Sequence, residues 1–168
     1  MIITGYHGTS KEIANIVLSK KEFELSSGDK EWLGNGIYFY FQYYDALDWT
    51  KQKKYHSPAI LHSIIQVPNE DVLDFDSKSG QDIFKRYENM FNSLGLELNP
   101  HSVQKNHCAL MNYIWKEADN YKVMIASFAK TKTVIHTLFD FRERRKEFCV
   151  RDNSVIRNII ELEVIKNE

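Results

Sequence analysis

The sequence contains little cysteine, little proline and no long hydrophobic run. Its two cysteines, Cys108 and Cys149, form no Cys-x-x-Cys pair and stand at no metal-ligand spacing from a histidine. This disfavours a disulfide framework, and we expect no bound metal. No apolar run approaches the roughly 20 residues that cross a bilayer. The first residues, Met-Ile-Ile-Thr-Gly, also lack the basic and apolar regions of a signal peptide, so we expect a cytoplasmic protein with no membrane partner.

An excess of charge of one sign is missing as well. The 22 Lys and Arg residues nearly balance the 23 Asp and Glu residues, and the formal net charge is -1. This balance argues against a strongly basic protein that binds nucleic acid without specificity, although it is compatible with a local basic patch. With 43% hydrophobic and 27% charged residues, the 168-residue chain is typical of a folded protein. We expect one domain over residues 1–168.

Hydrophobic periodicity and turn residues predict an α+β fold. Thr9 and Glu12 are typical of a capping box, which would begin a helix that runs to about Lys20. Further helices are expected near residues 44–54, 81–94 and 101–118, and strands near 37–41, 59–67, 71–75, 121–126, 133–139, 147–151 and 155–165. The late strands are too closely spaced for βαβ crossovers, which favours a largely antiparallel sheet.

The first motif of chemical interest is Gly-Tyr-His-Gly-Thr at residues 5–9, with His7 at the end of a short strand. Because glycine has no Cβ, Gly8 would let a ligand approach the backbone closely. Taken alone, the motif fits equally well a strand-end histidine that bonds to the backbone.

The second motif is Gly-Asn-Gly-Ile-Tyr-Phe at residues 34–39. Two glycines before an aromatic strand predict a tight turn in which a planar group lies against Tyr38, and Trp49 on the next helix would close the other face of the slot. Without the other motifs, an aromatic run in a strand is more often part of a core than of a pocket.

The third motif is Glu-Phe-Cys-Val at residues 147–150, which follows the basic run 144–146. If Phe148 and Val150 face the core, Glu147 and Cys149 share the opposite face of the strand. A carboxylate at this place is also compatible with an ordinary surface charge.

In this order, the three motifs resemble those of the diphtheria-toxin-like branch of ADP-ribosyltransferases, which includes the poly(ADP-ribose) polymerases and carries a His-Tyr-Glu triad. The chain is most similar to the compact bacterial DUF3990-type toxin domains. The resemblance runs from residue 5 to about residue 156, but residues 55–120 match no motif. It implies a split antiparallel β-sheet core with flanking helices, NAD+ as substrate and no metal.

The resemblance also implies roles for individual residues. His7 would hold the adenosine ribose, the Gly8 backbone would pair with the nicotinamide carboxamide, and Tyr38 and Trp49 would stack on the nicotinamide ring. Glu147 would bond the 2′-hydroxyl of the nicotinamide ribose and stabilise the oxocarbenium ion. The residues expected to bind NAD+ are His7, Gly8, Thr9, Tyr38, Phe39 and Trp49, with His7, Tyr38 and Glu147 as the catalytic triad.

Two positions depart from the family pattern. Members often carry a small hydroxyl residue where this chain has Ala46, so the contact that this residue makes with the carboxamide is missing or comes from elsewhere. Arginine-modifying toxins of the other branch carry a glutamate two positions before the catalytic one, where this chain has Arg145. Modification of protein arginines is therefore not expected.

Four basic residues immediately before Glu147 are candidates for binding the acceptor: Arg142, Arg144, Arg145 and Lys146. They would contact phosphates of a nucleic acid, or they form a solvated turn that Asp140 and Glu143 balance. We expect a mono-ADP-ribosyltransferase that modifies a macromolecule, RNA before DNA before a protein side chain.

By the same resemblance, the protein would be a bacterial toxin of a toxin–antitoxin or anti-phage system, with an antitoxin as a possible partner. An NAD+ glycohydrolase toxin and a non-catalytic module that binds NAD+ or ADP-ribose are the alternatives.

Overall fold

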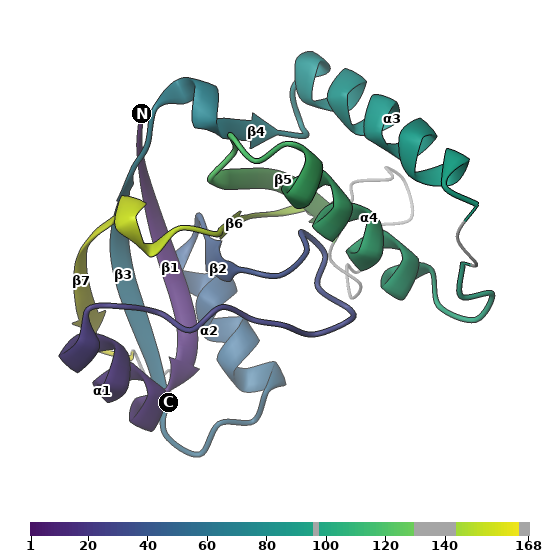
Figure 1. Cartoon of the computed structure of the whole chain (residues 1–168). Helices are drawn as coiled ribbons and strands as arrows, with labels where there is room; N and C mark the ends of the chain where they lie inside the picture. The colour runs from purple at the N-terminus through teal and green to yellow at the C-terminus, as the bar shows by residue number, and fades with distance from the viewer. Residues whose placement is uncertain (96–97, 130–143, 165–168) are drawn as a thin grey trace, which may run out of the picture.

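The computed structural model describes residues 1–95, 98–129 and 144–164 (Figure 1). The strands are β1 (Ile2–Ser10), β2 (Ile37–Tyr40), β3 (Pro58–Gln66), β4 (Val72–Asp74), β5 (Val123–Ala129), β6 (Arg144–Val150) and β7 (Ile156–Leu162). The helices are α1 (Lys11–Lys20), α2 (Tyr43–Gln52), α3 (Lys78–Ser93) and α4 (Val103–Glu117), with 3-10 turns η1 (Asn69–Asp71) and η2 (Asn153–Val155). The predicted strand 133–139 lies outside the described residues.

The described strands form one sheet in the order β4-β5-β6-β2-β1-β3-β7. Every neighbouring pair in it is antiparallel except β4 and β5, which run parallel. The predicted α+β class is therefore confirmed. Strands β4 and β5 can run parallel because the chain between them crosses over through α3 and α4 (Figure 1). None of the helices among the described residues is long and apolar enough to cross a membrane.

The sheet is weakly joined at its centre. Strands β1 and β2 are paired at one position only, Tyr6 opposite Tyr40. By contrast, β1 pairs with β3 along its whole length, and β6 pairs with every residue of β2. The sheet thus consists of two halves, β4-β5-β6-β2 and β1-β3-β7, which meet at a seam between β1 and β2.

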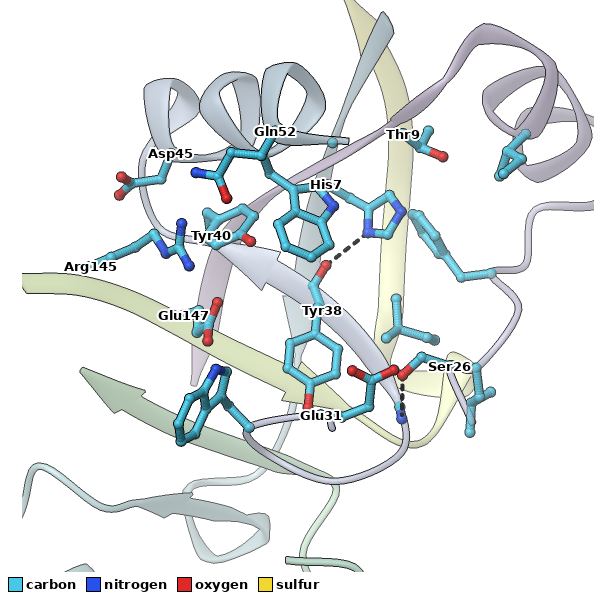
Figure 2. A pocket seen from close by; sticks show the side chains of 18 of the residues that line it. His7, Thr9, Ser26, Glu31, Tyr38, Tyr40, Asp45, Gln52, Arg145 and Glu147 are labelled. Atoms are coloured by element: carbon cyan, nitrogen blue, oxygen red, sulfur yellow. Dashed lines mark hydrogen bonds between the residues drawn. The ribbon is translucent and has the colours of Figure 1, made fainter. Parts of the chain in front are cut away.

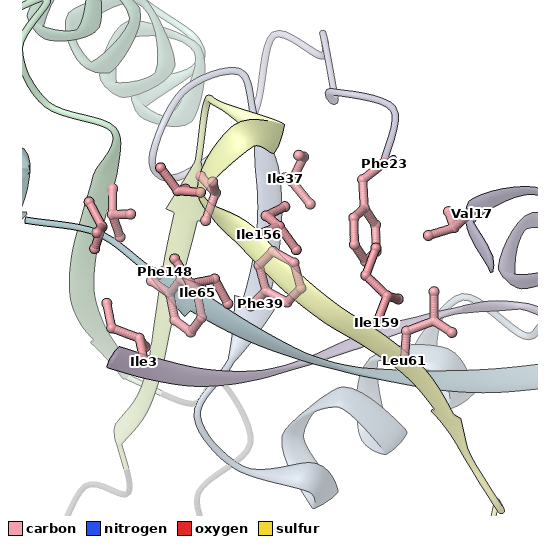
Figure 3. Close-up of a cluster of buried hydrophobic side chains, with 14 of the residues drawn as sticks. Ile3, Val17, Phe23, Ile37, Phe39, Leu61, Ile65, Phe148, Ile156 and Ile159 are labelled. Atoms are coloured by element: carbon pink, nitrogen blue, oxygen red, sulfur yellow. The ribbon is translucent and has the colours of Figure 1, made fainter. Parts of the chain in front are cut away.

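Strand alternation assigns the two faces of the sheet to different layers. Phe39 and Phe148 are fully buried on one face and stack with ring centroids 5.2 Å apart. They share a core cluster with Val17 of α1 and with Ile156 and Ile159 of the last strand (Figure 3). On the other face, α2 covers the β1-β3 half, and α4 covers β5 and β6. The predicted orientation of β6, with Phe148 and Val150 in the core and Glu147 and Cys149 opposite, is confirmed.

The first helix begins one residue later than predicted. Ser10 is its N-cap, and the Ser10 hydroxyl accepts a hydrogen bond from the Ile13 backbone N–H at 3.3 Å. Thr9 remains in β1. The shift matters because the Thr9 side chain then faces the cavity described below instead of capping a helix.

Candidate active site

One cavity of about 1210 Å³ opens between the two halves of the sheet (Figure 2). His7 from β1, Tyr38 from β2 and Glu147 from β6 all line it. The fold therefore brings the three predicted triad residues together, although they are far apart in the sequence. The volume exceeds the roughly 300–1,000 Å³ of typical small-ligand pockets, which suits an extended ligand.

His7 is fixed by a hydrogen bond across the seam. Its Nδ1 lies 2.7 Å from the backbone oxygen of Tyr38 (Figure 2). Because a carbonyl oxygen can only accept, Nδ1 carries the proton, and the neutral ring keeps an acceptor lone pair on Nε2. Burial lowers the His7 pKa, against a smaller opposing effect of this hydrogen bond, so the ring is neutral at physiological pH. Phe23 and Phe39 pack against it edge-on.

Tyr38 is held at its hydroxyl. The hydroxyl donates to the Gly34 backbone oxygen at 2.7 Å and accepts from the Leu33 backbone N–H at 2.8 Å. Gly34 has a positive φ of 75°, which glycine adopts without strain and which returns the chain toward the ring. Burial raises the pKa of Tyr38 far above its ordinary value, so the side chain is an orienting neutral ring and not an acid.

Helix α4 holds the loop that precedes Tyr38, a function that the sequence does not reveal. Four of its side chains bond backbone groups of residues 30–35. Trp115 Nε1 donates to the Leu33 oxygen at 2.7 Å, and Asn112 Oδ1 accepts from the Asn35 N–H at 2.7 Å. Gln104 and His107 bond the backbone oxygens of Lys30 and Trp32. These positions lie three, five and three residues apart, so that they share one side of the helix. In the sequence, a polar stripe beside a tryptophan is the signal that points to this role.

Glu147 is a buried carboxylate that faces the cavity. Its side chain is 3% exposed, and none of the described residues forms a hydrogen bond with it. Burial raises the Glu147 pKa to about 7; Arg145 opposes this shift, and Asp45 adds to it. The carboxyl group therefore changes its charge close to neutral pH.

Alternation along the strands also removes two predicted contacts from the cavity. Phe39 points into the core between Tyr38 and Tyr40, which line the cavity, and it supports His7 from behind. Lys146 points to the same core face as Phe148, where it pairs with Asp74 at 3.4 Å and Asp76 at 3.2 Å. Lys146 points away from the cavity because neighbouring residues of a strand face opposite sides. Its charge is balanced there by the two aspartates.

Gly8 lines the cavity, but its missing side chain serves a different purpose from the one expected. A Cβ at Gly8 would lie 2.4 Å from the backbone oxygen of Ala46 and 2.9 Å from the Thr50 side chain. Glycine is therefore required for α2 to pack on β1, and the Cβ direction does not point to a ligand. Trp49 lines the cavity, with its ring centroid 6.5 Å from that of Tyr40 and the Lys53 ammonium 4.5 Å from its ring centre. Its stacking on a nicotinamide ring opposite Tyr38 stays a prediction.

The remaining basic residues of the predicted acceptor site separate in the same way. Arg144 is exposed at the start of β6 and does not line the cavity. Arg145 does line it, with its guanidinium carbon 5.0 Å from the centre of the Tyr40 ring (Figure 2). Arg142 lies outside the described residues.

Both cysteines are buried and unpaired. Within residues 1–95, 98–129 and 144–164, no three His, Cys, Asp or Glu side chains are grouped as metal ligands.

Comparison with known proteins adds one relative. The chain is 24% identical to an uncharacterized protein of Methanocaldococcus jannaschii over an alignment of 191 positions, which covers 94% of this chain and 86% of that protein. No family model and no solved structure matches the sequence. The class that the fold and cavity define is thus an α+β protein in which a buried carboxylate, a half-buried tyrosine and a half-buried histidine line one large cavity.

Proposed function

We propose that this protein is a mono-ADP-ribosyltransferase that cleaves NAD+ and transfers ADP-ribose to a macromolecule. The observation that carries the proposal is the convergence of His7, Tyr38 and Glu147, from three motifs in the family order, on one cavity. The weak seam between β1 and β2 supports it too, because the resemblance implies a split sheet. The full-length match to an uncharacterized relative neither favours nor opposes an activity.

In the proposed reaction, the bond between the nicotinamide nitrogen and C1′ of its ribose breaks. The electron pair of this bond goes to the nitrogen and neutralises the pyridinium. A lone pair of the acceptor then forms a bond to C1′, and the acceptor releases a proton to solvent. The charge that develops on the ribose is positive, so a fixed carboxylate aimed at it lowers the barrier, and does so more strongly in a water-poor cavity.

The side chains suit this division of work. The Nε2 lone pair of neutral His7 accepts a hydrogen bond from a ribose hydroxyl, and the Tyr38 ring, held in place at its hydroxyl, offers a flat surface on which nicotinamide stacks. Glu147 must be ionised to stabilise the cation, and it would accept a hydrogen bond from a hydroxyl of the bound ribose. We propose that Thr9, Gly8 and Trp49 complete the donor site, and that Phe39 acts by supporting His7.

The experiment is to incubate the protein with radiolabelled NAD+ and bacterial lysate, beside the Glu147→Gln variant. Label on a macromolecule that nuclease or protease removes, absent with the variant, supports the transferase. Free ADP-ribose without macromolecular label identifies an NAD+ glycohydrolase instead. No NAD+ turnover, with binding of NAD+ retained in calorimetry, contradicts both and leaves a binding module.

We propose further that the protein is a toxin of a toxin–antitoxin or anti-phage system. Induced expression in bacteria should then arrest growth, whereas the Glu147→Gln variant should not. Growth that is equal with both proteins would contradict this role.

A further inference from the structure

One arginine and two aromatic rings form a row beside Glu147. Arg145 stands directly opposite Phe128 in the β5–β6 pairing, so the two side chains leave the sheet on the same face. The ring centroid of Trp32 lies 5.5 Å from that of Phe128. Glu147 is two residues from Arg145 on the same face, at a backbone distance of about 7 Å. All four residues line the cavity.

Arg145 is the member of this row with unused donors. Its Nε is buried without a hydrogen-bond partner, and its guanidinium makes no ion pair with any described residue. Its guanidinium carbon lies 5.0 Å from the centre of the Tyr40 ring, and a cation–π contact of this kind does not consume the N–H donors. Asp45 and Glu147 are close enough to act on one another and on Tyr40. The local charge is therefore mixed, and an anionic acceptor that binds in a bidentate way, such as phosphate, suits the remaining donors.

The aromatic part of the row is open to solvent. Trp32 is 40% exposed although it is a large apolar side chain, and Phe128 is half-buried. The backbone under Trp32 is fixed, because His107 bonds the Trp32 oxygen at 2.8 Å. An exposed tryptophan on a fixed backbone, beside a half-buried phenylalanine and an arginine, is an arrangement that binds single-stranded nucleic acid, with the base stacked and the phosphate on the cation.

We propose that Arg145, Phe128 and Trp32 form a subsite for one nucleotide of a single-stranded nucleic acid, the acceptor of the reaction. Arg145 binds the phosphate, Trp32 and Phe128 stack on the base, and the nucleotide is thereby held next to Glu147, where C1′ of the donor reacts. This inference rests on the proposed function for its catalytic meaning, but the binding itself can be tested separately. It assigns acceptor selection to one arginine of the basic run, since Lys146 is paired elsewhere.

The first test is binding without NAD+. The anisotropy of a fluorescein-labelled single-stranded oligoribonucleotide is measured with the intact chain and with Arg145→Gln, Trp32→Ala and Arg86→Gln. Arg86 is the matched control, because it is an exposed arginine over a tyrosine ring, 5.9 Å from the centroid of Tyr87, and it does not line the cavity. We expect each of the first two variants to weaken binding about 10-fold or more and the control to bind like the natural chain. Equal binding by Arg145→Gln and the natural chain would overturn the proposal.

The second test separates transfer from cleavage. Nicotinamide release without an acceptor and label transfer to the oligoribonucleotide are measured at pH 8.5, above the Glu147 pKa of about 7. The ratio of label transfer to nicotinamide release should fall about 10-fold in Arg145→Gln, recover in part in Arg145→Lys, and stay unchanged in the control Arg86→Gln; an unchanged ratio in Arg145→Gln would overturn the subsite.

The two tests also distinguish this proposal from the proposed function. Labelling of an acidic peptide in place of the oligoribonucleotide would overturn the nucleotide subsite and identify a carboxylate acceptor. NAD+ cleavage by a chain that does not bind the oligoribonucleotide would overturn the subsite alone. Arg145-dependent binding without any NAD+ turnover would refute the transferase and keep the subsite.

Discussion

Replacing Glu147 with glutamine should make the protein more stable as it makes it inactive. The carboxylate is buried and forms no hydrogen bond with any residue that the structure describes, and its pKa rises from 4.5 to about 7 on folding. At about 1.4 kcal/mol for each tenfold change in proton affinity, the ionised group costs about 3 kcal/mol of unfolding free energy. Glutamine has nearly the same shape and no charge, so Glu147→Gln removes this cost.

The sign of the effect depends on pH. Below pH 4.5 the carboxyl is protonated in both the folded and the unfolded chain, and it costs nothing. Between pH 4.5 and about 7 the unfolded chain loses the proton while the folded protein keeps it, so stability falls as the pH rises. Above pH 7 the cost is complete. The stability gain of the variant should therefore be near zero at pH 4 and about 3 kcal/mol at pH 8.

Urea unfolding followed by tryptophan fluorescence measures this gain at both pH values. The exposed Glu70 supplies a control, because Glu70→Gln changes the same chemical group without burial and should leave the unfolding free energy unchanged. Nicotinamide release by Glu147→Gln should fall about 100-fold or more. A variant that is no more stable than the natural chain at pH 8, or whose gain is the same at pH 4, would refute the assignment of Glu147 as a desolvated carboxylate.

Four further predictions concern the same cavity. The kcat/KM for NAD+ should rise with pH and level off above about 7, as Glu147 ionises; a profile flat from pH 5 to 9 would contradict this. His7→Ala should weaken NAD+ binding in calorimetry and lower the rate, and unchanged affinity would rule out the ribose contact. Tyr38→Phe leaves two backbone groups without a partner, so thermal unfolding should show a loss of about 1–3 kcal/mol and KM should rise. Gly8→Ala forces a Cβ against α2 and should lower the free energy of unfolding in urea by about 1–3 kcal/mol. An unchanged free energy of unfolding would mean that α2 shifts to make room for the Cβ.

Much of the fold could be predicted because local patterns determine it. The α+β class and most helices and strands follow from periodicity, caps and turn residues, and the orientation of β6 follows from the alternation of Phe148 and Val150. The three motifs also indicated which residues converge. What local patterns do not contain is the pairing between distant strands, so the parallel β4–β5 pair and the single contact between β1 and β2 appear only in the structure.

The candidate site was predictable to the level of motifs but not of individual side chains. A motif resemblance assigns a role in the site to every residue of the motif. In a strand, however, alternate side chains point away from the site, and this is why Phe39 and Lys146 face the core side. The reason for Gly8 lies in a helix 38 residues later in the chain, which no local pattern reveals. The contribution of α4 to the loop before Tyr38 depends in the same way on tertiary packing.

The seam between the half-sheets has a dynamic consequence. His7 belongs to one half, and Tyr38 and Glu147 belong to the other, yet the backbone ladder joins the halves at a single residue pair. A dinucleotide that contacts His7 and Glu147 together would link the two halves of the sheet, in addition to the His7–Tyr38 hydrogen bond. Amide hydrogens of β1 and β2 near the seam should therefore exchange with solvent more slowly when NAD+ is bound, while those of the outer strands keep their rates.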